Sequence, residues 1–120
     1  MDYRFINMEY LNSVSEGDPE IISEILHLFK EQAIEIYNEM MVHYSEKNYT
    51  SLGFLAHKAK SSVAILGMDD LALLLKTFEI QAKDGIENER YESYISRFKV
   101  ETDAAVIELE DYVNSLQSKK

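Results

Sequence analysis

The sequence predicts an all-α fold, an up-down antiparallel four-helix bundle preceded by a short covering helix. Apolar residues recur at intervals of three and four over most of the chain, which is typical of amphipathic helices. With one proline and four glycines in 120 residues, the chain has long uninterrupted segments, separated by residues that commonly cap or end helices. The length suits one domain and is too short for two, so residues 1–120 are expected to form a single domain.

Charge and composition exclude several classes of function. The formal net charge is −10, whereas nucleic-acid binding needs a basic surface and an anionic membrane would repel the chain. The absence of cysteine excludes disulfides and thiolate chemistry. No apolar run approaches transmembrane length, and the N-terminus has no secretory pattern. We therefore expect a cytoplasmic protein whose partners include neither nucleic acid nor membrane.

Residues that commonly cap or begin helices predict where the first two helices start. Asn7 is suited to cap a short helix, with Ile6 and Leu11 forming a hydrophobic staple around it. Residues 18–19, an Asp-Pro pair, combine a cap with a proline in the first helical position, so a long helix is expected to run to about Tyr44. Its apolar stripe is expected to contain Ile22, Ile25, Leu26, Leu28, Phe29, Ala33, Ile36 and Met40.

The third and fourth helices have equally clear ends. Asn48 can cap the third helix, and Gly67 suits the left-handed conformation that follows a helix. Its inner face should comprise Leu52, Leu55, Ala56, Ala59, Val63 and Leu66. Asp69 and Asp70 suit the positive end of the next helix, which stops near Gly85. That helix should bury Leu71, Leu74, Leu75, Phe78 and Ala82.

The last helix is expected from about Asn88 to about Leu116. Its apolar positions alternate steps of four and three, the spacing of a bundle seam. They are Tyr91, Ile95, Phe98, Thr102, Ala105, Leu109, Tyr112 and Leu116. Four long helices with short connections predict antiparallel neighbours.

The stretch LAHKAKSSVAILG turns a histidine away from the core. At about 100° per residue, His57 lies about 140° from Leu52, the centre of the apolar stripe. Its neighbours Gly53, Ser61 and Ala64 are small. A helical wheel, drawn with the same angle per residue, places all three outside the stripe. A glycine inside a helix costs about 1 kcal/mol relative to alanine, so helix stability alone does not favour this face.

The surface around His57 suits the approach of another protein. Phe54 and Ile65 add apolar area, and Lys58 adds a positive charge. Lys60 follows His57 by three residues and is its neighbour on the helix surface, where it would hold an anion on the imidazole. Since histidine can form covalent intermediates, the pattern indicates a phosphoryl acceptor, with a merely solvated histidine as the competing interpretation. The expected docking residues are Gly53, Phe54, Lys58, Ser61, Ala64 and Ile65.

The chain resembles the histidine-containing phosphotransfer (HPt) domain of two-component phosphorelays. The family's core motif is a histidine, a lysine three residues later, small residues and a final glycine. It matches Ala56, His57, Lys60, Ser61, Ser62 and Gly67 in this sequence. The upstream Gly-Asp-Pro-Glu at 17–20 and the downstream leucine-rich segment 71–79 match as well, so the resemblance covers residues 5–117. Many members have glycine where this chain has Ser61.

The resemblance implies a phosphorelay intermediate. His57 would accept a phosphoryl group on Nε2 from a receiver-domain aspartate and pass it to another receiver. Lys60 matches the phosphate-stabilising residue. Glu79 matches a residue that hydrogen-bonds near Nδ1 of the imidazole, although it could equally solvate the rim of its helix. Such a module is not an enzyme and has no cofactor, since the receiver supplies the acidic pocket and Mg²⁺.

Two other functions are compatible with a helical bundle. The first is an adaptor that binds receivers without accepting phosphate. The second is a di-iron protein, because Glu24 and His27 form a Glu-x-x-His pair; such a site needs two copies, so no metal site is expected. Leu73 and Ile80 fall on the outer side of their helix and either meet the N-terminal helix or extend the docking face.

Overall fold

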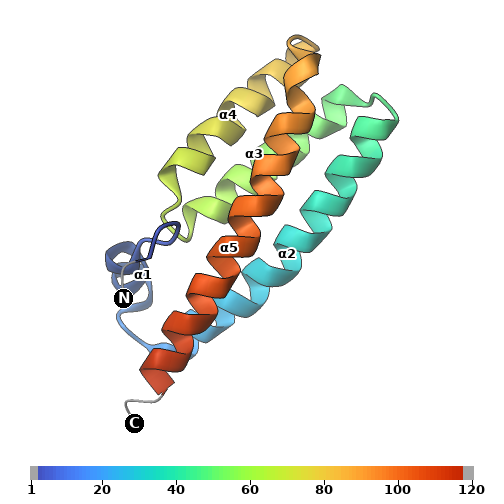
Figure 1. Ribbon diagram of the computed structural model, residues 1–120. Coiled ribbons are helices and arrows are strands. Elements are labelled where there is room, and N and C mark those ends of the chain that lie inside the picture. The colour runs from blue at the N-terminus through green and yellow to red at the C-terminus, as the bar shows by residue number, and fades with distance from the viewer. Residues whose placement is uncertain (1–2, 118–120) are drawn as a thin grey trace.

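The computed structural model describes residues 3–117, which are helical except for the segment before the first helix and short connections, and which contain no strand. In chain order the elements are α1 (Met8–Ser15), α2 (Pro19–Ser45), α3 (Tyr49–Ala64), α4 (Asp69–Asp84), a 3-10 turn η1 (Asn88–Arg90) and α5 (Tyr91–Gln117). Figure 1 shows α2, α3, α4 and α5 lying lengthwise against one another, with α1 below the turn between α3 and α4. The prediction of an all-α protein is confirmed.

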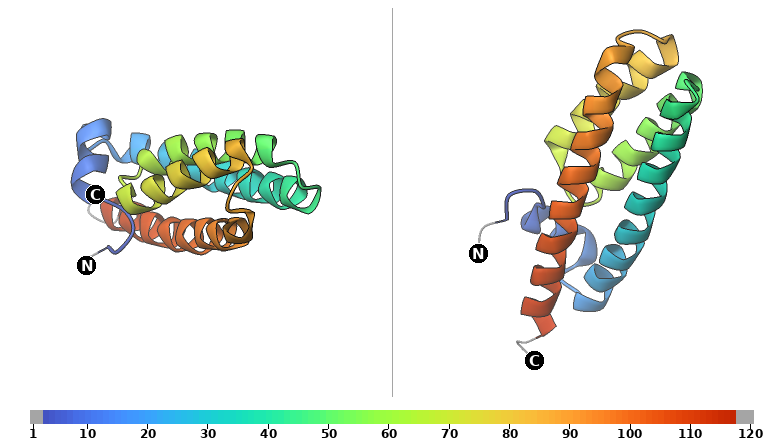
Figure 2. Two further views of the ribbon diagram at one scale, coloured as in Figure 1. Left: turned by 90° about the horizontal axis from the view of Figure 1, so that it is seen from above. Right: turned by 45° about the vertical axis from the view of Figure 1, so that its right-hand side comes forward.

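The helices pack in adjacent pairs. Helix α3 contacts α4 and α2, and α5 contacts α2 and α4. The result is an elongated body of 50 × 21 × 20 Å. Figure 2 shows it from above and turned by 45° about the vertical axis. Since α3 and α4 make the most extensive contact, any side chains facing each other across that pair are held close together.

The predicted helix starts are confirmed. The side chains of Asn7, Asp18 and Asn48 each accept a hydrogen bond from a backbone N–H two or three residues later, at 3.1, 2.9 and 3.4 Å. Gly85 ends α4 with φ of +67°. A capping side chain satisfies a donor that the helix itself leaves free, which explains why these polar residues mark the boundaries.

The core contains the stripes that the sequence indicates, with one exception on α2. The expected inner residues of α3 are all buried, as is the α5 seam from Tyr91 to Tyr112. Leu28, however, is 56% exposed. Only α3 and α5 cover α2 extensively, and the expected stripe is wider than the surface they cover. The leucine therefore lies at the open edge of α2.

The segment before α1 is fixed against α5 and the α3–α4 turn. The Glu108 carboxylate accepts the backbone N–H groups of residues 4–6, at 2.9 to 3.1 Å. The Tyr3 hydroxyl donates to Asp111 at 2.7 Å, and burial together with that bond raises the pKa of Tyr3 to about 12. The Asn7 N–H donates to the carbonyl oxygen of Leu66 at 3.0 Å. These contacts anchor the covering segment away from the exposed face of α3.

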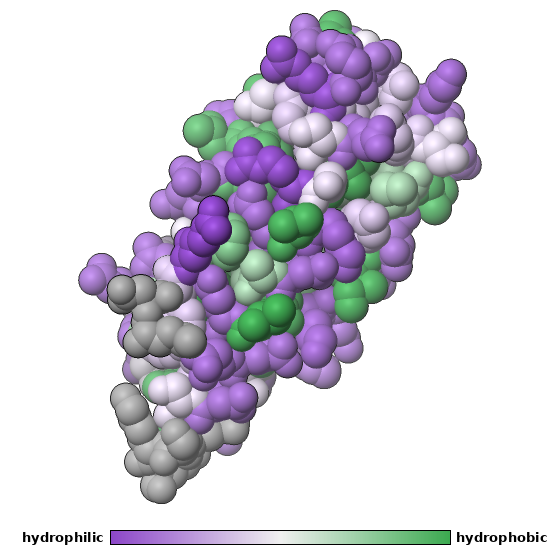
Figure 3. All heavy atoms as spheres, viewed as in Figure 1, coloured by the Kyte–Doolittle hydropathy of each residue, from purple (hydrophilic) through white to green (hydrophobic). Residues whose placement is uncertain are grey.

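No helix in the described part of the chain is long and apolar enough to cross a lipid bilayer. The surface in Figure 3 is mainly hydrophilic, with scattered apolar residues along the visible face.

Candidate functional site

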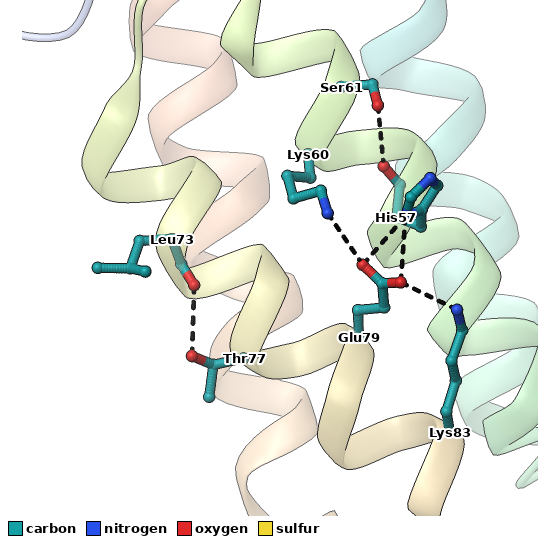
Figure 4. Close-up of polar contacts among 7 residues, drawn as sticks. All are labelled: His57, Lys60, Ser61, Leu73, Thr77, Glu79 and Lys83. Atoms are coloured by element: carbon teal, nitrogen blue, oxygen red, sulfur yellow. Dashed lines mark hydrogen bonds and ion pairs between the residues drawn. The ribbon is translucent and has the colours of Figure 1, made fainter.

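His57 and Glu79 meet across the interface of α3 and α4 (Figure 4). Nδ1 of the imidazole lies 3.1 Å from each carboxylate oxygen. The His57 side chain is 57% exposed, whereas that of Glu79 is only 12% exposed. The site therefore has a carboxylate at its base and an imidazole at its surface.

Two lysines share the Glu79 carboxylate with the imidazole. Lys60 Nζ lies 3.3 Å from Oε1, and Lys83 Nζ lies 2.9 Å from Oε2. The pKa of Glu79 falls from its ordinary value of 4.5 to about 2, chiefly because Lys83 donates to it. Burial opposes this shift, and hydrogen bonds from His57 and Lys60 add to it. The carboxyl group is consequently ionised at neutral pH.

The ionised carboxylate determines which imidazole nitrogen is available for chemistry. Because a carboxylate only accepts hydrogen bonds, Nδ1 of His57 must be the donor and carry the proton. In the neutral ring, Nε2 then holds the free lone pair. Figure 4 shows this second nitrogen on the side of the ring turned away from Glu79. His57 thus presents a nucleophilic nitrogen to the surface beside two ammonium groups.

Gly53 lies inside the α3–α4 interface, so the expectation that it belongs to the exposed face is wrong. A Cβ at this position would be 2.6 Å from Cγ of Lys83 and 3.3 Å from the carbonyl oxygen of Glu79. The wheel treats α3 in isolation, whereas α4 approaches closely enough to bury a wider sector of it. Glycine at this position allows the approach that brings Glu79 under His57.

The other expected docking residues are exposed on α3. Phe54 is 63% exposed and Ile65 is 47% exposed. The remaining ones, Lys58, Ser61 and Ala64, are exposed as well. The Ser61 hydroxyl donates to the backbone carbonyl of His57 at 3.4 Å. Small and apolar side chains therefore surround the imidazole without covering it.

A shallow apolar groove of about 90 Å³ lies between α2 and α3. Its lining includes the exposed Leu28 and Ile65. At its floor, the buried Ser62 hydroxyl donates to Gln32 at 3.1 Å. The groove adjoins the helix that carries His57 and shares Ile65 with the expected docking residues.

Leu73 and Ile80 lie on the exposed side of α4, at 66% and 52% exposure. This leaves them uncovered, although one of the two possibilities derived from the sequence was contact with the N-terminal helix. Glu24 and His27 lie exposed on α2, where His27 pairs with Glu31 at 3.4 Å. Within residues 3–117, no group of three or more metal-binding side chains is close enough to hold an ion.

Lys83 is the residue of this site that the sequence analysis did not identify. It follows Glu79 by four residues, a spacing that places an acidic and a basic side chain next to each other on a helix. This spacing is visible in the sequence, but acidic and basic residues four apart are common on solvent-exposed helices and do not by themselves indicate a site. What distinguishes this pair is the histidine that α3 brings to the same carboxylate.

No protein-family model, curated protein or solved structure matches this chain.

Proposed function

We propose that this chain is a histidine phosphotransfer module of a two-component phosphorelay. In this proposal, His57 accepts a phosphoryl group on Nε2 from the aspartyl phosphate of a receiver domain and passes it to another receiver. The observation that carries the proposal is the His57–Glu79 contact, at 3.1 Å from Nδ1 to both carboxylate oxygens. It leaves an exposed Nε2 as the free ring nitrogen.

The transfer step balances without an additional base. The Nε2 lone pair of His57 forms the N–P bond while the P–O bond of the aspartyl phosphate breaks, and the aspartate leaves with the electron pair as a carboxylate. The Nδ1 proton remains in place, so the phosphorylated ring carries a positive charge, which the Glu79 carboxylate offsets. The reverse sequence passes the group to the next receiver.

Local charge favours a phosphoryl group at this position. With a neutral imidazole, Glu79 contributes one negative charge and the two lysines contribute two positive charges, which leaves one net positive charge beside His57. The whole chain, in contrast, has a formal net charge of −10. Lys60 follows His57 by three residues on the same helix, so its ammonium group can reach the oxygens of a phosphoryl group on the imidazole.

The surface around His57 suits a receiver domain as partner. Phe54, Lys58, Ser61, Ala64 and Ile65 form the proposed contact area, and the small side chains at 61 and 64 permit close approach to the imidazole. The receiver would supply the acidic pocket and Mg²⁺, so the chain itself acts as a phosphocarrier without a cofactor. The proposal includes a cytoplasmic location and the up-down antiparallel four-helix arrangement typical of such modules.

The experiment that tests this function is phosphoryl transfer from a panel of phosphorylated receiver domains in the presence of Mg²⁺. Wild type should acquire an acid-labile label, and His57→Gln should acquire none. His27→Gln is the matched control because His27 is also an exposed histidine, and it should accept the group as wild type does. Binding of receivers without transfer by the folded wild-type chain would favour the adaptor instead.

A further inference from the structure

Two lysines each bind a different oxygen of the Glu79 carboxylate. Lys83 binds Oε2 at 2.9 Å, whereas Lys60 binds Oε1 at 3.3 Å. Figure 4 shows the two ammonium groups on opposite sides of the carboxylate. Because each uses a different oxygen, one lysine can leave Glu79 while the other stays.

Lys83 has contacts besides Glu79 that hold it in place, although its side chain is 38% exposed, compared with 29% for Lys60. Its stem passes over Gly53, where an added Cβ would lie 2.6 Å from Cγ of the lysine. Its ammonium group also lies 5.0 Å from the centroid of the Phe54 ring, a distance suited to a cation–π interaction. Glycine leaves room for the stem, and the aromatic face and carboxylate hold the charged end.

Lys60 is placed differently. It belongs to α3, the helix of His57, and its side chain is 29% exposed. A lysine three residues after the histidine can turn from Glu79 to a group on the imidazole without any backbone movement. That turn removes one of the two cations from the carboxylate.

We propose that Lys83 is a positioning residue that keeps Glu79 on Nδ1 of His57 when Lys60 turns to the phosphoryl group on Nε2. The inference rests on the proposed function and adds a division of labour between the two lysines. A phosphoryl group carries about two negative charges at neutral pH. With Lys83 in place, the largely buried Glu79 carboxylate keeps a second cationic partner on Oε2, in addition to the charged ring of the phosphorylated His57.

The resting protein allows a test that needs no phosphoryl group. Lys60→Met imitates the departure of Lys60, and nitrogen-15 NMR of the full chain reports which ring nitrogen of His57 is protonated. We expect Lys60→Met to retain the Nδ1-protonated form. Adding Lys83→Met should raise the share of Nε2-protonated imidazole by about two- to fivefold, the range that a partly exposed ion pair supports.

Two further variants separate positioning from charge. Lys83→Arg in the Lys60→Met background should restore the wild-type spectrum, because arginine also donates to the carboxylate. Lys76→Met in that background is the matched control: it removes the same charge from an exposed position of α4 that forms no hydrogen bond or ion pair with Glu79. Glutamine in place of methionine repeats the comparison if a variant is poorly folded by circular dichroism.

The outcomes are distinct. An unchanged share of Nε2-protonated imidazole in the Lys60→Met/Lys83→Met protein would overturn the inference, as would a rise of that share in Lys60→Met alone. Phosphoramidate, whose P–N bond breaks as Nε2 of His57 bonds to phosphorus and ammonia leaves, tests the function separately. A wild-type chain that shows the expected tautomers but takes no phosphoryl group from phosphoramidate or receivers would refute the proposed function, while Lys83 would still be shown to hold Glu79 on Nδ1 of His57 in the resting protein.

Discussion

Gly53 of α3 packs directly against Lys83 of α4, and the space between them leaves no room for a side chain at residue 53. A Cβ at residue 53 would lie 2.6 Å from the lysine Cγ and 3.2 Å from its backbone nitrogen. The first clash is with a flexible side chain, but the second is with the backbone of α4. The short distance between the two helices therefore depends on glycine at residue 53, and the contact of Glu79 with His57 depends on that distance.

We expect Gly53→Ala to raise the free energy of unfolding by less than a glycine-to-alanine change normally does inside a helix. In an open helix this change stabilises by about 1 kcal/mol. Here the added methyl group pushes against α4, so we expect the gain in the free energy of unfolding to be absent and the His57 ring signals to shift in NMR spectra. Urea denaturation measures the first effect. An increase of about 1 kcal/mol with unchanged His57 signals would contradict this account.

Acid should remove the contribution of Glu79 to stability. The folded-state pKa of about 2 lies below the ordinary value of 4.5, so the unfolded chain binds a proton first as pH falls. The contribution is complete above about pH 4.5 and is lost as pH falls towards 2. We expect it to be of order 1–3 kcal/mol, because the lysine partners are partly exposed.

Glu79→Gln measures that contribution. The variant should be less stable than wild type at pH 7, and the difference should shrink as pH approaches 2 in urea denaturation series. Glu39→Gln, at an exposed position of α2, is the matched control and should differ little from wild type at either pH. A Glu79→Gln deficit that stays constant from pH 7 to pH 2.5 would show that the carboxylate charge is not responsible.

Lys60→Ala should slow phosphoryl transfer without abolishing it. In the proposed transfer the lysine would stabilise developing charge on the phosphoryl oxygens without forming a bond to phosphorus, so we expect a decrease of about tenfold, equivalent to about 1.4 kcal/mol. Single-turnover transfer from a phosphorylated receiver measures the rate. Lys76→Ala should match wild type. A complete loss of transfer with the fold intact would instead make Lys60 indispensable to the chemistry.

A bulky residue at position 64 should weaken receiver binding. Ala64 is exposed on α3 beside the His57 face, so Ala64→Tyr should be compatible with folding but obstruct an approaching partner. We expect the dissociation constant to rise about tenfold, which corresponds to about 1.4 kcal/mol. Ser93→Tyr, at an exposed position on α5, should leave the affinity unchanged. Equal affinities for both variants would place the docking surface elsewhere.

Local sequence signals predicted the helices well because caps act within a few residues. Asn7, Asp18 and Asn48 satisfy donors in their own helices, so their effect does not depend on distant partners. The outward placement of His57 also follows from periodicity alone, and the structure confirms its exposure.

Features that depend on the distance between helices could not be obtained from periodicity. The wheel placed Gly53 outside because it contains no information about α4, which covers that sector. The sequence does not assign Lys83 to the site, because an acidic and a basic residue four apart indicate only a neighbouring pair. Leu28 belongs to the predicted stripe but is exposed, because periodicity does not give the width of the helix surface that neighbouring helices cover. All three depend on how closely separate helices approach.

The most direct test of the central claim is the identity of the phosphorylated atom. The wild-type chain would be labelled by a phosphorylated receiver with Mg²⁺, digested under alkaline conditions and mapped by mass spectrometry, with nitrogen-15 NMR to distinguish the ring nitrogens. We predict an acid-labile, base-stable phosphoryl group on Nε2 of His57. A phosphoryl group on another residue, or none on a folded chain that binds the receiver, would contradict the account.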